Sequence, residues 1–175
     1  MPTFTYMFTV NAPLTAVSRF HHDTQALKTL TPPPIFVQIH HADPLADGAV
    51  AEFTMWFGPL PVRWTAVHSH VSETGFTDTQ VSGPLQSWQH THTFTAVSPT
   101  TTRIHEHIDY SHDDGRRGLL SRLLFNPAGL YLLFTARQLI TRWHLELSPA
   151  QRRGVRGAVG LLAAAASLAL WRYRR

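Results

Sequence analysis

The chain has 175 residues, of which 43% are hydrophobic and only 15% are charged, so it is long enough and apolar enough for one domain with a substantial core. Its formal net charge is +4, but six of the fifteen basic residues lie within the last 24 positions, which argues against a nucleic-acid-binding body. There is no cysteine, which excludes disulfides, thiolate metal sites and cysteine nucleophiles.

Seven strands and two helical regions are predicted in chain order. Residues 3–10 alternate between large apolar side chains and mostly threonine, which is typical of a strand. Asn11 is expected to cap one or two short helices over residues 11–30, with His21 and His22 as an exposed or cap-adjacent pair. Further strands are predicted at residues 35–40, 50–57 and 62–72, in both arms of a hairpin over 76–94, and at 103–110.

The hairpin over residues 76–94 places ionisable and aromatic side chains on one face. Alternate residues of a strand share a face, and this face holds Phe76, Asp78, Gln80, Trp88, His90, His92 and Phe94, while threonines dominate the other. Threonine suits a solvated face, so the aromatic face is expected to be covered and to take Asp78, His90 and His92 inside. Buried ionisable groups are costly unless they are paired. The hairpin therefore predicts a polar site within an apolar interior.

Strand register predicts a carboxylate beside each of two histidines. A hairpin centred on Pro99 places His92 opposite Glu106, and the hairpin over 76–94 places Asp78 opposite His90. The expected inward-facing set is Asp78, Gln80, Trp88, His90, His92, Glu106 and Tyr110.

After residue 115 the spacing of apolar residues changes from that of a strand to that of a helix. A long helix is predicted over residues 118–146, interrupted or restarted at Asn126-Pro127. The stripe expected to pack into the sheet is Leu123, Leu130, Leu133 and Phe134. This order of elements indicates an α+β fold in which a curved antiparallel sheet wraps around the long C-terminal helix.

Four segments carry a resemblance to a known superfamily: NAPLTAVSRFHHDTQALKTLTPPP, DPLADGAVAEFTMWFGPLPVRWTA, FTDTQVSGPLQSWQHTHTF and TRIHEHIDY. They resemble the START-like helix-grip (SRPBCC) superfamily. More narrowly, they resemble the polyketide cyclase/dehydrase-type domain that occurs alone or fused ahead of an epimerase-like oxidoreductase. The resemblance runs from about residue 4 to 143 and implies an apolar ligand held between sheet and helix. Glu106 departs from the pattern, which more often carries Asp there.

The inward-facing polar set leaves three interpretations open. The residues can form structural or ligand-orienting pairs, they can act in acid/base catalysis, or they can bind a metal. Three His-x-His pairs suit metal binding by their spacing, namely His68/His70, His90/His92 and His105/His107, but the register turns the last pair outward. We therefore predict no metal and no cofactor.

The expected function is binding of a small hydrophobic or amphipathic ligand, such as a lipid, a quinone-like or a polyketide-like compound. The expected ligand-binding residues are Trp64, Phe76, Asp78, Gln80, Trp88, His90, His92, Phe94, Glu106, Tyr110 and Phe134. One alternative is a cyclase/dehydratase-type enzyme with His90 or His92 as general acid/base, Asp78 and Glu106 being further catalytic candidates. A second alternative is a membrane-tethered interaction module.

Residues 1–147 are expected to form the helix-grip domain, 148–156 a basic linker and 157–175 an apolar helix that anchors the chain in a membrane. Fifteen uncharged residues from Gly157 to Trp171 lie between arginines. As a helix they would extend roughly 22 Å at about 1.5 Å per residue, so flanking arginines must help to bridge a hydrocarbon core of about 30 Å. An interfacial or partner-bound helix and a helix folded onto the domain are the alternatives. The N-terminus has no secretory signal pattern, so we expect the domain to lie in the cytoplasm.

Overall fold

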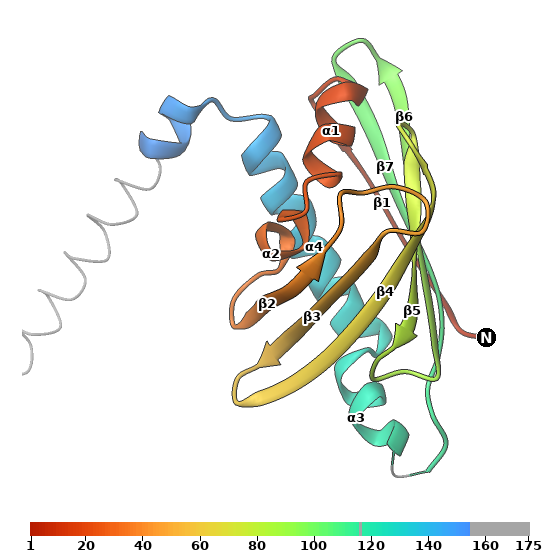
Figure 1. Ribbon diagram of the computed structural model, residues 1–175. Coiled ribbons are helices and arrows are strands. Elements are labelled where there is room, and N and C mark those ends of the chain that lie inside the picture. Colours follow the sequence, from red (N-terminus) through yellow and green to blue (C-terminus); the bar gives the residue numbers. More distant parts are fainter. Residues whose placement is uncertain (116, 155–175) are drawn as a thin grey trace, which may run out of the picture.

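The computed structural model describes residues 1–115 and 117–154, and these form a curved seven-stranded antiparallel sheet with helices on one face (Figure 1). In chain order the elements are β1 (Thr3–Val10), α1 (Leu14–His21), α2 (Ala26–Leu30), β2 (Ile35–Ala42), β3 (Val50–Phe57), β4 (Leu60–Ser72), β5 (Gly75–Ser82), β6 (Ser87–Ser98), β7 (Thr101–Ser111), α3 (Arg117–Leu124) and α4 (Pro127–Leu145). The predicted α+β fold class, the seven strands and the long helix after the last strand are confirmed.

The strand order is β1-β7-β6-β5-β4-β3-β2, so β1 pairs with the last strand and β2 forms the opposite edge. From β2 to β7 the strands follow one another as hairpins, while α1 and α2 connect the two edges. The register agrees with the prediction at the two decisive points: Asp78 is opposite His90, and His92 is opposite Glu106. The inward and outward faces of the central strands are therefore those expected from sequence.

A polar layer crosses the sheet between two apolar clusters. Along β6, Trp88 belongs to the first cluster, His90 and His92 follow, and Phe94 belongs to the second. On β7, Glu106 lies in the same way between residues of the two clusters. The two clusters include, respectively, Phe53, Trp64, Trp88, Ile108, Tyr110, Leu130 and Phe134, and Phe8, Val10, Val17, Phe76, Phe94 and Ile104.

The C-terminal helical region breaks where Asn126-Pro127 predicted a break. The Asn126 side chain accepts a hydrogen bond from the Gly129 backbone N–H (2.9 Å), and Pro127 occupies the first turn of α4. Proline cannot donate to the preceding turn, so α4 starts anew and bends by 45° from α3.

The bend corrects one expectation about the helix stripe. Leu130 and Phe134 are buried as expected, but Leu123 is 71% exposed. A helix that restarts at a bend loses the phase of its apolar stripe, so Leu123 no longer faces the sheet. Phe125, which lies at the bend, is buried in its place.

The start of α1 is also different from the expectation. Pro13 is the N-cap residue, and its side chain makes no capping hydrogen bond. Asn11 instead donates its backbone N–H to the Glu146 carboxylate (2.8 Å), which ties the end of β1 to the residue after α4.

Within residues 1–115 and 117–154, no single helix has the length and apolar character needed to cross a membrane. Gly118–Leu124 and Pro127–Leu145 pass that test only when the bent pair is taken together. Residues 149–154 of the expected linker are helical. The expected anchor, residues 157–175, lies outside the described residues.

Phe134 gives a test of how much the contact between α4 and the sheet stabilises the fold. Its ring lies 5.4 Å from that of Phe4 and 6.1 Å from that of Tyr6, and the side chain is 1% exposed. We expect Phe134→Ala to lower the free energy of unfolding by roughly 3–5 kcal/mol. Leu132→Ala on the exposed side of the same helix should change it by less than about 0.5 kcal/mol. Urea denaturation measures both, and equal losses would contradict this packing.

Candidate functional site

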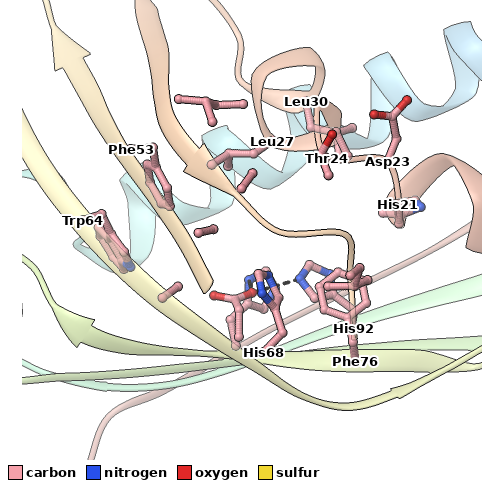
Figure 2. Close-up of a pocket in the computed structure, with 18 of the residues that line it drawn as sticks. His21, Asp23, Thr24, Leu27, Leu30, Phe53, Trp64, His68, Phe76 and His92 are labelled. Carbon is pink, nitrogen blue, oxygen red and sulfur yellow. Dashed lines mark hydrogen bonds and ion pairs between the residues drawn. The ribbon is translucent and has the colours of Figure 1, made fainter. Parts of the chain in front are cut away.

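A pocket of about 160 Å³ lies between the concave face of the sheet and the helices α2 and α4. Figure 2 shows Phe53 and Trp64 on one side of it, His92 and Phe76 on the other, and Leu27 and Leu30 facing them from α2. Most of its wall is apolar, and this part consists of Leu27, Leu30, Ile39, Ala51, Phe53, Met55, Trp64, Ala66, Trp88, Leu133 and Phe134.

One end of the pocket is polar because β5 and β6 direct ionisable side chains into it. Asp78, His90 and His92 line this end, and Glu106 of β7 lies buried beside the two histidines without lining the pocket. His90 and His92 are 3% and 7% exposed, whereas Asp78 keeps 20% of its side chain exposed. Asp78 is thus the most accessible member of the group, which we call the acid–histidine cluster.

Each histidine of the acid–histidine cluster contacts both carboxylates. Glu106 Oε2 lies 2.8 Å from His90 Nε2 and 2.7 Å from His92 Nδ1. Asp78 Oδ2 lies 3.2 Å from His92 Nε2 and 3.4 Å from His90 Nδ1. The first and third of these contacts have hydrogen-bond geometry, and the two rings lie 3.9 Å apart. The sequence predicted two separate acid–histidine pairs, and the structure joins them into one group of four.

The mutual contacts set the protonation of the cluster. Burial lowers the pKa of His92, but Glu106 and Asp78 outweigh it and raise that pKa to about 9. Burial lowers the pKa of His90, and the neighbouring His92 lowers it further. Burial alone would raise the pKa of Glu106, yet the two histidines hold it well below the usual range. At neutral pH the cluster therefore carries two carboxylates, one imidazolium and one neutral imidazole.

Arg137 on α4 supplies a further positive charge that the sequence analysis did not assign to the site. It lines the pocket, and its guanidinium carbon lies 5.1 Å from the centre of the Phe134 ring. Its buried Nε has no hydrogen-bond partner among the described residues. Together with the imidazolium, the Arg137 guanidinium balances the two negative charges of the carboxylates. A signal was present in the sequence, since residues 130, 133, 134 and 137 share one face of a helix.

His21 is buried, which corrects the expectation that it is exposed or merely adjacent to a cap. It is 6% exposed, its Nδ1 donates to the Val17 carbonyl (2.9 Å), and its ring lies 4.9 Å from that of Phe94. His21 also lines the pocket. The signal in the sequence was its position one turn after Val17, on the apolar side of α1. His21 and His22 were instead interpreted together as one exposed pair.

The other expected ligand-binding residues divide into two groups. Trp64, Phe76, Trp88 and Phe134 line the pocket. Gln80, Phe94 and Tyr110 do not: Gln80 Nε2 donates to the Leu85 carbonyl at the β5–β6 turn (2.7 Å), and the two aromatic residues pack in the apolar clusters.

The remaining His-x-His pairs do not join the cluster. His68 lines the pocket and donates from Nδ1 to the Ala49 carbonyl (3.0 Å), but His70 is exposed because the β4–β5 register shifts after Ser69. His105 and His107 are on the opposite face of β7 from Glu106, as the register predicted.

The fold has counterparts among solved structures, although the chain matches no protein-family model and no curated protein sequence. A protein from Chromobacterium violaceum shares 15% identity with a TM-score of 0.68, and the match covers 85% of this chain and 100% of that one. The ZhuI aromatase/cyclase from a Streptomyces species shares 16% identity with a TM-score of 0.66, covering 83% and 93%. A START superfamily protein from Mycobacterium smegmatis shares 14% identity with a TM-score of 0.61, covering 82% and 97%. The chain thus has the START-like helix-grip fold.

The buried His21 predicts a specific pH dependence of stability. Burial is the main cause that lowers its pKa from 6.5 to about 4. As pH falls below 6.5, His21 binds a proton in the unfolded chain but not in the folded chain. The contribution of His21 to the free energy of unfolding is therefore complete above pH 6.5 and declines toward pH 4. The full loss is on the order of 3 kcal/mol.

The comparison that tests this contribution is between the unmodified chain and His21→Asn. The asparagine keeps an amide donor for Val17 but does not titrate, so the decline in unfolding free energy between pH 6.5 and 4 should become smaller. Denaturation at several pH values measures it. Parallel pH profiles for the two proteins would show that His21 does not contribute.

Proposed function

We propose that this protein binds a small hydrophobic or amphipathic molecule, with the apolar part of the ligand against the aromatic wall and its polar end at the acid–histidine cluster. The observation that carries the proposal is the division of one pocket into an apolar wall and a charged end. A pocket with this division orients an amphipathic ligand, because each end of the ligand is favourable in only one position. Lipid, quinone-like and polyketide-like compounds all have this character.

The expected binding residues take different parts in the proposal. Trp64, Trp88 and Phe134 supply apolar contact area, and Asp78, His90 and His92 meet the polar end. Glu106 acts indirectly, since it holds the two histidines. The structural likeness to an aromatase/cyclase and to a START superfamily protein supports a ligand of this general kind.

An acid/base enzyme of the cyclase or dehydratase kind is the second candidate function. One imidazolium and one neutral imidazole line the same pocket, which is the arrangement that proton transfer to and from a bound molecule needs. His92 would be the acid and His90 the base. Mass spectrometry of small molecules that copurify with the chain separates the candidates: a binder retains one compound, whereas an enzyme converts an added compound of that class.

We further propose that residues 157–175 attach the domain to the cytoplasmic side of a membrane. The uncharged run from Gly157 to Trp171, with arginines on both sides, supports this proposal.

The pocket predicts that two neighbouring substitutions on β4 will differ in their effect on binding. Ala66 lines the pocket, and Thr65 points to the opposite face of the sheet. Ala66→Leu should weaken binding of 1-anilinonaphthalene-8-sulfonate, an amphipathic fluorescent probe, by tenfold or more because the larger side chain occupies the site. Thr65→Leu should leave the affinity unchanged. Equal affinities for both variants would place the probe elsewhere.

Membrane attachment through burial predicts resistance to salt. The full chain should sediment with phospholipid vesicles and stay bound in about 1 M NaCl, where attraction between exposed charges is screened beyond about 3 Å. Ala164→Arg, which places a charge within the uncharged run, should release it. If salt alone releases the unmodified chain, arginines at the lipid surface hold it instead.

A further inference from the structure

We propose that Asp78, His90 and His92 form a binding site for one divalent first-row transition-metal ion, and that Glu106 orients the two imidazoles from behind. One donor atom from each of the three residues lies within 4.8 Å of the others. Sequence reasoning set a metal aside because His105 and His107 turn outward. The structure provides Asp78 as the third ligand, so those outward histidines are not needed.

The acid–histidine cluster favours an extra cation, because two neutral imidazoles cannot supply an N–H group to every contact. Its four ring nitrogens all lie within 3.4 Å of a carboxylate oxygen. Two neutral imidazoles carry only two N–H groups. The two contacts with hydrogen-bond geometry, His90 Nε2 with Glu106 and His92 Nε2 with Asp78, account for both of them. His90 Nδ1 and His92 Nδ1 then keep lone pairs within 3.4 Å of carboxylate oxygens, and a cation, either a proton or a metal ion, would reduce this repulsion.

The contact distances indicate where a metal ion fits. The 2.8 Å contact of His90 Nε2 with Glu106 has hydrogen-bond geometry and suits an N–H donor, whereas His92 Nδ1, 2.7 Å from the same oxygen, lacks that geometry. This leaves the lone pair of His90 Nδ1 beside Asp78 Oδ2, and a metal ion would take the place of the proton that His92 Nε2 shares with that oxygen. These nitrogens are 3.4 and 3.2 Å from that oxygen. Ligand atoms about 2.1 Å from one ion lie about 3.0–3.4 Å apart in octahedral or tetrahedral geometry, so the spacing fits.

Glu106 has the position of a carboxylate that supports metal-binding histidines. Such histidines usually donate the ring N–H that does not face the metal to a carboxylate or carbonyl, which fixes the tautomer and the ring orientation. Glu106 is 4% exposed and contacts both rings through one oxygen atom. It lies outside the pocket lining, whereas Asp78, His90 and His92 lie within it.

The donor set and the pocket define the kind of ion and its remaining ligands. Two imidazoles and one carboxylate suit Zn²⁺ or Fe²⁺, and three protein ligands leave coordination positions open toward the pocket. Two carboxylates, a divalent ion and Arg137 give a net charge of +1. An anionic oxygen on the pocket ligand would neutralise it, and this last step alone rests on the proposed function.

Metal titration of the full, untagged chain after treatment with a chelator tests the proposal. Calorimetry with Zn²⁺ and visible absorption with Co²⁺ should both give one ion per chain, with histidine-coordinated Co²⁺ giving bands in the visible range. Asp78→Asn and His92→Gln should each weaken binding by 100-fold or more. Glu106→Gln should weaken it by about 10–100-fold, as for other supporting carboxylates.

The outward pair on β7 provides a matched control for adventitious histidine binding. The double variant His105→Gln/His107→Gln removes the same residue types at the same spacing and should keep full affinity. No stoichiometric binding by the unmodified chain would overturn the proposal. Binding that survives Asp78→Asn, or that is lost in the control, would also overturn it.

Two further measurements keep the outcome interpretable. Circular dichroism identifies any variant that does not fold. If a histidine or Glu106 variant does not fold, Asp78→Asn decides the test, because the partly exposed Asp78 side chain tolerates substitution best. In the unmodified chain, Zn²⁺ should raise the melting temperature, because binding to the folded state stabilises it. The fluorescent probe should bind the metal-free chain whether or not a metal site exists, so failure of the metal proposal and failure of ligand binding are distinguishable.

Discussion

Two carboxylates on the covered face of the sheet, Glu106 buried and Asp78 largely covered, are the constraint on which this structure depends. An isolated buried carboxylate is strongly unfavourable, and removing one partner of a buried pair is among the most destabilising changes a protein can undergo. Asp78 and Glu106 are tolerable because His90, His92 and Arg137 lie around them. The partners lie on β6 and α4, and the carboxylates lie on β5 and β7, so the carboxylates are paired only when strand register and helix position are both correct.

The cluster therefore depends most strongly on the register of the strands. A slip of one residue between β5 and β6 would turn His90 and His92 to the outer face and leave Asp78 without a partner. The apolar clusters on either side oppose the same slip, because Trp88 and Phe94 would move outward with the histidines. Polar and apolar residues of β6 thus favour one register for different physical reasons. Local and long-range preferences that agree in this way are typical of sequences that fold to a single structure.

The sequence predicted most of this arrangement, because strand parity and turn position determine which residues oppose each other. It could not predict the diagonal contact between His90 and Glu106. Register places His90 opposite Ile108, and the contact depends on side-chain rotamers. The roles of Leu123 and Phe125 were missed for a different reason, since the 45° bend at Pro127 changes the phase of the stripe. Arg137 and His21 were recoverable from helical spacing, but a charged residue on an apolar stripe is ordinarily assigned to solvent.

The contacts already made within the cluster also limit what the pocket can select. A ligand group that merely accepts or donates a hydrogen bond gains little, because it must compete with contacts of 2.7–3.4 Å that already exist within the cluster. Arg137 is different, since its buried Nε donor lacks a partner among the described residues. Arg137 also lines the pocket, so an oxygen anion can form an ion pair with its guanidinium without disrupting any contact within the cluster. Selectivity at the polar end should therefore favour ligands that combine an apolar body with a carboxylate or enolate oxygen, and should disfavour neutral hydrocarbons of the same size.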